Sequence, residues 1–85
     1  MERDKKLILL ADDDIDQLNQ MQFHIESFGF DTVVAGSQKA CEDIIAERRP
    51  DLAIFDLMME NEDSGFILSY KLKKKYPDVP IIIAS

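Results

Sequence analysis

The stretch LILLADDDID, residues 7–16, joins five apolar residues directly to a dense group of negative charges. The apolar run, residues 7–11, has the length and the unbroken hydrophobicity of a β-strand that is covered on both faces. Three aspartates, residues 12–14, follow at once, and Asp16 adds a fourth. Like charges repel one another and are costly to bury. This strand end therefore calls for a ligand that compensates the charge.

The composition describes one small globular domain. The chain has 85 residues, of which 46% are hydrophobic, so one modest core is expected and disorder is not. Its longest apolar runs are about five residues, against roughly twenty for a membrane span. The net charge of −7 argues against direct binding to nucleic acid. The single cysteine, Cys41, cannot form an internal disulfide, which suits the cytoplasm.

The spacing of apolar residues alternates between that of strands and that of helices. It predicts strands at 7–11, 32–35, 52–55 and 79–84. Helical stripes between them are formed by Leu18, Met21, Ile25 and Phe28, then by Ala40, Cys41, Ile44 and Ile45, and then by Gly65, Leu68, Leu72 and Tyr76. Asp14 and Ser37 are predicted N-caps, and Gly29 suits the end of the first helix. The order β-α-β-α-β-α-β predicts an α/β fold with a doubly wound parallel sheet and helices on both faces.

Acidic side chains stand at the carboxyl ends of two predicted strands. Asp12 and Asp13 follow the first strand, Asp56 follows the third, and Ser85 follows the fourth. Ligands of open parallel sheets bind outside these strand ends, so we expect the acids to converge there. Hard oxygen ligands without a nearby histidine or thiolate favour Mg²⁺ or Mn²⁺. Asp56, alone at its strand end, is the better candidate for a nucleophile towards phosphorus.

Four segments carry a family resemblance: ILLADDDID, PDLAIFDLMM, SGF and PIIIAS. In this order and spacing they resemble the receiver domain of two-component response regulators, over nearly the whole chain. The resemblance implies a flavodoxin-like (CheY-like) fold and a regulatory module rather than an enzyme. It also implies a sensor histidine kinase or a phosphotransfer protein as partner, and Mg²⁺ as cofactor.

The resemblance assigns roles to five residues. Asp12 and Asp13 match the metal-binding acids, and Asp56 matches the phosphoacceptor, which also contacts the metal. Met58 matches the position whose backbone carbonyl completes the metal shell. Ser85 matches the switch hydroxyl that turns towards the phosphoryl group.

The chain departs from the family pattern at two places. Glu60 stands where the family usually has proline, in a slightly longer loop, and its charge would weaken metal or phosphodonor binding. The chain also ends after the fourth strand, so residues 1–85 are expected to be a receiver domain that lacks its fourth helix, fifth strand and fifth helix, with the lysine of that fifth strand. The fourth strand would then be an apolar edge, residues 81–83, that favours dimers, segment swapping or aggregation.

Other functions were weighed against the same residues. An EF-hand calcium loop beginning at Asp12 would need glycine and glutamate where the chain has Gln17 and Phe23, so it is rejected. An aspartate-nucleophile phosphatase, resembling the haloacid dehalogenase superfamily, would use Asp12, but the motif is incomplete and there is no room for a cap. A degenerate or truncated receiver that binds partners without phosphorylation remains an alternative.

Overall fold

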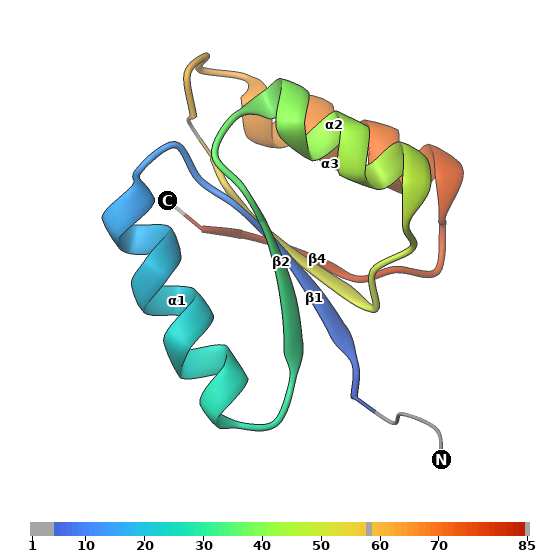
Figure 1. Cartoon of the computed structure of the whole chain (residues 1–85). Coiled ribbons are helices and arrows are strands. Elements are labelled where there is room, and N and C mark those ends of the chain that lie inside the picture. The colour runs from blue at the N-terminus through green and yellow to red at the C-terminus, as the bar shows by residue number, and fades with distance from the viewer. Residues whose placement is uncertain (1–4, 58, 85) are drawn as a thin grey trace.

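The computed structural model describes residues 5–57 and 59–84 and contains one parallel sheet with helices on both faces. The elements are β1 (Leu7–Ala11), α1 (Ile15–Ser27), β2 (Asp31–Ala35), α2 (Gln38–Glu47), β3 (Leu52–Asp56), α3 (Ser64–Lys75) and β4 (Ile81–Ala84). The strand order is β2-β1-β3-β4. Helix α1 lies on one face, whereas α2 and α3 lie together on the other (Figure 1). The predicted doubly wound α/β architecture is confirmed.

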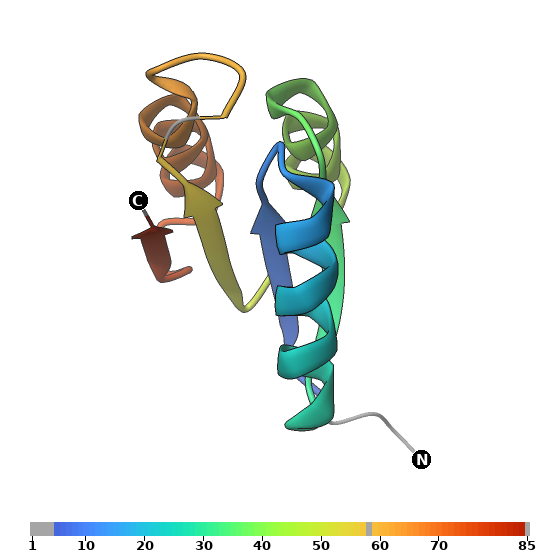
Figure 2. The ribbon, with the colours of Figure 1, turned by 90° about the vertical axis from the view of Figure 1, so that its left-hand side faces the viewer.

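The strand register brings the ends of β1 and β3 level with each other. Ala11 is paired with Ala35 of β2 on one side and with Phe55 of β3 on the other. The next residues along the two central strands are therefore Asp12 and Asp56. The strands run in the same direction, so their carboxyl ends open at one edge of the sheet (Figure 2).

Local capping explains where the first two helices begin. The Asp14 carboxylate accepts a hydrogen bond from the Gln17 N–H, and the Ser37 hydroxyl oxygen accepts one from the Ala40 N–H. Both predicted N-caps are thus confirmed. Gly29, with φ of +95°, follows the end of α1 in the left-handed conformation that glycine adopts without strain.

The predicted bounds of the second and third strands differ from β2 and β3 by one residue, and two further predictions about element ends are wrong. Phe28 was assigned to the buried stripe of the first helix, but it is the C-cap and its side chain is 78% exposed. The fourth strand was expected to begin at Val79, whereas β4 begins at Ile81. Val79 is nevertheless buried, because its N–H donates to the carbonyl of Tyr76 in the turn after α3 and its side chain joins the core.

The core has two unequal parts. The larger fills the space between the sheet and α2 and α3, where Phe55, Leu68 and Leu72 are fully buried. The smaller lies beneath α1, around Ile8, Leu10 and Leu18. Within the residues that the structure describes, no helix has the length and apolar character needed to cross a membrane.

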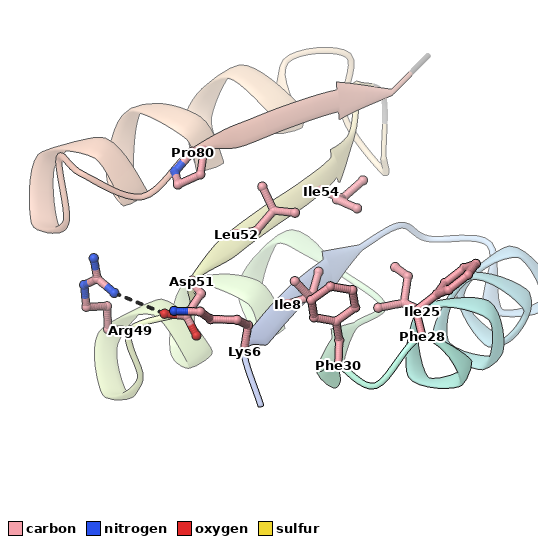
Figure 3. A pocket seen from close by; sticks show the side chains of 10 residues that line it. All are labelled: Lys6, Ile8, Ile25, Phe28, Phe30, Arg49, Asp51, Leu52, Ile54 and Pro80. Carbon is pink, nitrogen blue, oxygen red and sulfur yellow. Dashed lines mark ion pairs between the residues drawn. The ribbon is translucent and has the colours of Figure 1, made fainter. Parts of the chain in front are cut away.

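The sheet face beside α1 carries an apolar groove. Its volume is about 460 Å³. The groove is lined by Lys6, Ile8, Ile25, Phe28, Phe30, Arg49, Asp51, Leu52, Ile54 and Pro80 (Figure 3). The groove exists because α1 covers β1 and β2 more closely than β3 and β4, and it accounts for the partial exposure of Leu52 and Ile54.

Candidate functional site

Three aspartates meet at the carboxyl edge of the sheet. Asp12 and Asp13 follow β1, and Asp56 is the last residue of β3. Each offers a carboxylate oxygen, and these oxygens all lie within 4.8 Å of one another. Asp12 is buried, Asp56 is partly buried and Asp13 is exposed, so the cluster is open to solvent on one side. The predicted convergence of these acids is confirmed.

Local hydrogen bonds fix the buried member of this cluster. The Asp12 backbone N–H donates to the carbonyl of Ala35 at 3.1 Å, which continues the β1–β2 pairing past the end of the strands. One carboxylate oxygen of Asp12 accepts a hydrogen bond from the Asp14 N–H at 3.0 Å. The Asp14 carboxylate accepts a hydrogen bond from the Gln17 N–H, so it caps α1 instead of joining the cluster. The turn from β1 into α1 therefore holds the Asp12 side chain at the sheet edge.

The charges of the cluster favour a bound cation. Carboxylates that lie this close together repel one another, and solvent on the exposed side of the cluster screens only part of that repulsion. An octahedral Mg²⁺, with ligands at about 2.1 Å, joins oxygens up to about 4.2 Å apart. The upper bound of 4.8 Å on the distances between the aspartate oxygens is close to that span. Their hard oxygen donors suit Mg²⁺ or Mn²⁺.

Two further residues singled out in the sequence, Met58 and Ser85, lie outside the described residues. Their neighbours are placed: the Leu57 N–H donates to the carbonyl of Ala84 at 2.8 Å, and Met59 packs into the core. The ends of β3 and β4 therefore lie side by side at the edge where the aspartates gather.

The loop after β3 has contacts that sequence reasoning missed. Glu60 accepts hydrogen bonds from the backbone N–H of Gln38, the first residue of α2. The buried hydroxyl of Ser64 donates to the Gln38 side chain and accepts from the Asn61 N–H. In the sequence Glu60 stands out only as a departure from the family pattern, and no periodicity connects it with Gln38, 22 residues away.

Gly65 closes this loop against the end of β3. Its N–H donates to the carbonyl of Leu57 at 3.1 Å. A Cβ atom at this position would lie 2.9 Å from the carbonyl oxygen of Asp56, closer than real Cβ contacts come. The absence of a side chain thus lets the start of α3 approach the backbone that carries Asp56.

Cys41 takes no part in this site. Its side chain is fully buried in the core beneath α2. Burial, and to a smaller extent the charge of Glu42, raises the pKa of the Cys41 thiol to about 12. The thiolate is therefore scarce at neutral pH, and Cys41 serves as a small apolar core residue.

Comparison with known proteins identifies similar sequences and structures. Residues 8–85 match the model of the response regulator receiver domain. A heme response regulator of Staphylococcus aureus, HssR, is 35% identical over 75 residues, which are 88% of this chain and 33% of that protein. The chain thus spans about a third of the length of this curated relative.

Solved receiver domains have the same fold. The Francisella response regulator 1452 receiver domain superposes with a TM-score of 0.81 and 30% identity, over 93% of this chain and 64% of that one. A CheY-like receiver domain protein from Methanospirillum hungatei gives a TM-score of 0.88 and 26% identity, over 96% and 68% of the two chains. These similarities cover the sheet, its three helices and the edge that carries the aspartates.

Proposed function

The chain belongs to the response regulator receiver domain family, and we propose that it accepts a phosphoryl group on Asp56 from a histidine kinase or a phosphotransfer protein, with Mg²⁺ bound beside it. In this proposal Asp12, Asp13 and Asp56 supply carboxylate ligands to the metal. Met58 contributes its backbone carbonyl, and Ser85 hydrogen-bonds the phosphoryl group. The observation that carries the proposal is the meeting of the three carboxylates at one sheet edge.

The chemistry assigned to Asp56 is a single displacement at phosphorus. A carboxylate oxygen of Asp56 forms a bond to phosphorus while the bond from phosphorus to the donor nitrogen of a phosphohistidine breaks, and the electron pair leaves with that nitrogen. A divalent cation held by Asp12 and Asp13 would neutralise the oxygens of the transferred group. The hydrogen bond from the Asp14 N–H keeps the Asp12 carboxylate oriented.

Acetyl phosphate, a small phosphodonor, tests this proposal without a kinase. In the presence of Mg²⁺ we expect the intact mass of the chain to rise by one phosphoryl group, and we expect no rise when excess chelator removes the metal. Peptide mapping should place the group on Asp56. Modification of Asp12 instead would indicate phosphatase-like chemistry, and modification that is indifferent to chelation would contradict the metal site.

We also propose that the outer edge of β4 pairs with another strand, in a dimer or a segment swap. Within residues 5–57 and 59–84 β4 lies at the edge of the sheet, and Ile82 and Ile83 are 50% and 38% exposed. Exposed apolar edges act as templates for strand pairing.

Sedimentation equilibrium of the 85-residue chain is expected to show dimers or larger species that Ile82→Lys reduces. As a control, Phe66→Lys changes an exposed apolar residue of α3 and should have no effect. A wild-type monomer at high concentration would contradict the edge pairing.

A further inference from the structure

Gln38 contacts the loop after β3 through both its backbone and its side chain. Its backbone N–H lies 3.2 and 3.1 Å from the two carboxylate oxygens of Glu60. Its Oε1 accepts a hydrogen bond from the Ser64 hydroxyl at 2.9 Å. Its Nε2 donates to the Glu42 carboxylate at 3.0 Å. That last bond, one turn further along α2, orients the amide so that Oε1 faces the loop.

The two loop residues that contact Gln38, Ser64 and Glu60, are themselves in favourable surroundings. Ser64 is fully buried, and its hydroxyl oxygen also accepts a hydrogen bond from the Asn61 N–H at 3.3 Å. A buried hydroxyl that loses its acceptor lowers the stability of the folded chain. The hydrogen bond from Ser64 to Gln38 is therefore expected to be important for the position of the loop. The Glu60 carboxylate lies at the positive end of the α2 dipole, where a negative charge is stabilised. The middle of the loop is therefore tied to another helix.

We propose that Gln38 and Glu60 are positioning residues that brace residues 59–63 against the first turn of α2 and thereby set the geometry of the metal site at Asp56. What the site binds rests on the proposed function. The loop leaves Asp56 at one end and returns through the Gly65–Leu57 hydrogen bond at the other. Without the brace, residues 59–63 lose a contact that fixes their position, and metal sites weaken when their supporting contacts are removed.

Mn²⁺ binding, followed by the electron paramagnetic resonance of the free ion, tests the brace. Gln38→Ala removes the acceptor of Ser64 without changing charge, and Glu60→Ala removes the loop's bond to α2. Each is expected to raise the Kd for Mn²⁺ roughly tenfold. Glu60→Gln keeps an acceptor oxygen and should restore most of the affinity. Glu62 is exposed and makes no hydrogen bond or ion pair with the described residues, so Glu62→Ala controls for charge alone and should change the Kd by less than about twofold.

Amide hydrogen exchange in the metal-free chain provides a readout that is independent of the ion. Gln38→Ala should speed exchange of the Asn61 N–H, whose acceptor is Ser64, while the amides of β1 keep their protection. Faster exchange in β1 as well would indicate general destabilisation and overturn the positioning role. Wild-type affinity in both Gln38→Ala and Glu60→Ala would also overturn it. If the wild-type chain binds no Mn²⁺, the proposed function fails, and the exchange of Asn61 alone decides whether the brace exists.

Discussion

Asp56→Asn is expected to abolish phosphoryl acceptance while leaving the chain folded and, without metal, more stable. The amide cannot act as the attacking carboxylate, so the intact mass should not change with acetyl phosphate and Mg²⁺. The same change removes two of the three repulsions among carboxylates that lie within 4.8 Å of one another. Because solvent screens part of that repulsion, we expect the free energy of unfolding in chelator and low salt to rise by about 1 kcal/mol. Urea unfolding measures this gain.

Asp63→Asn is the matched control for this variant. Asp63 lies in the loop that follows Asp56, is exposed, and makes no side-chain hydrogen bond to the described residues although it is the N-cap residue of α3. Its replacement should leave phosphorylation and metal-free stability near the wild-type values. Phosphorylation of Asp56→Asn at the wild-type rate would remove Asp56 from the mechanism. A loss of stability in that variant would show that the cluster is not under electrostatic strain.

Gly65→Ala is expected to destabilise the chain by about 2 kcal/mol and to slow phosphorylation of Asp56. The added Cβ would lie 2.9 Å from the Asp56 carbonyl oxygen and 3.0 Å from two backbone atoms of Leu57. Backbone atoms cannot turn aside as a flexible side chain can, so either α3 or the end of β3 must move. Movement of β3 displaces Asp56 relative to Asp12. Urea unfolding and the acetyl phosphate reaction measure the two effects.

Gly36→Ala provides a comparison at the same edge of the sheet. There the new Cβ would lie 3.4 Å from the terminal methyl group of Ile15, an exposed side chain that can move. Stability within about 0.5 kcal/mol of the wild type is expected, since surface changes of this kind are usually small. Equal tolerance of alanine at both glycines would mean that the close approach of Gly65 to β3 does not constrain the site.

Glu60 is a residue whose position near Asp56 could be predicted from the sequence, whereas its hydrogen-bond partner could not. Its charge was expected to weaken metal or phosphodonor binding because it replaces the usual proline near Asp56. The structure places its carboxylate on the backbone N–H of Gln38, at the N-terminus of α2. The brace proposed above predicts the opposite effect on the metal, because Glu60→Ala is expected to raise the Kd for Mn²⁺. The partner of Glu60, the backbone N–H of Gln38, belongs to a separate helix, and the residues around Glu60 in the sequence do not indicate this contact.

The errors at Phe28 and Val79 have a common physical cause. Apolar spacing predicts which residues would share a face if the helix or strand continued, but it does not determine where hydrogen bonding stops. Gly29 turns the chain out of α1 one residue after Phe28, so Phe28 lines the groove beside α1 instead of lying beneath the helix. Val79 is buried by a turn, whereas the pairing of β4 begins after Pro80.

The sequence by itself determined the alternation of strands and helices, the N-caps Asp14 and Ser37, and the position of Asp12 and Asp56 at strand ends. These are local properties, because residue spacing and capping chemistry act within a few positions of the chain. The tertiary structure alone decided the register of β1 against β3, in which Ala11 is paired with Phe55, and that Gln38 meets Glu60. Such contacts depend on how whole strands and helices pack against one another. Packing brings together hydrogen-bonding groups that lie far apart in the sequence.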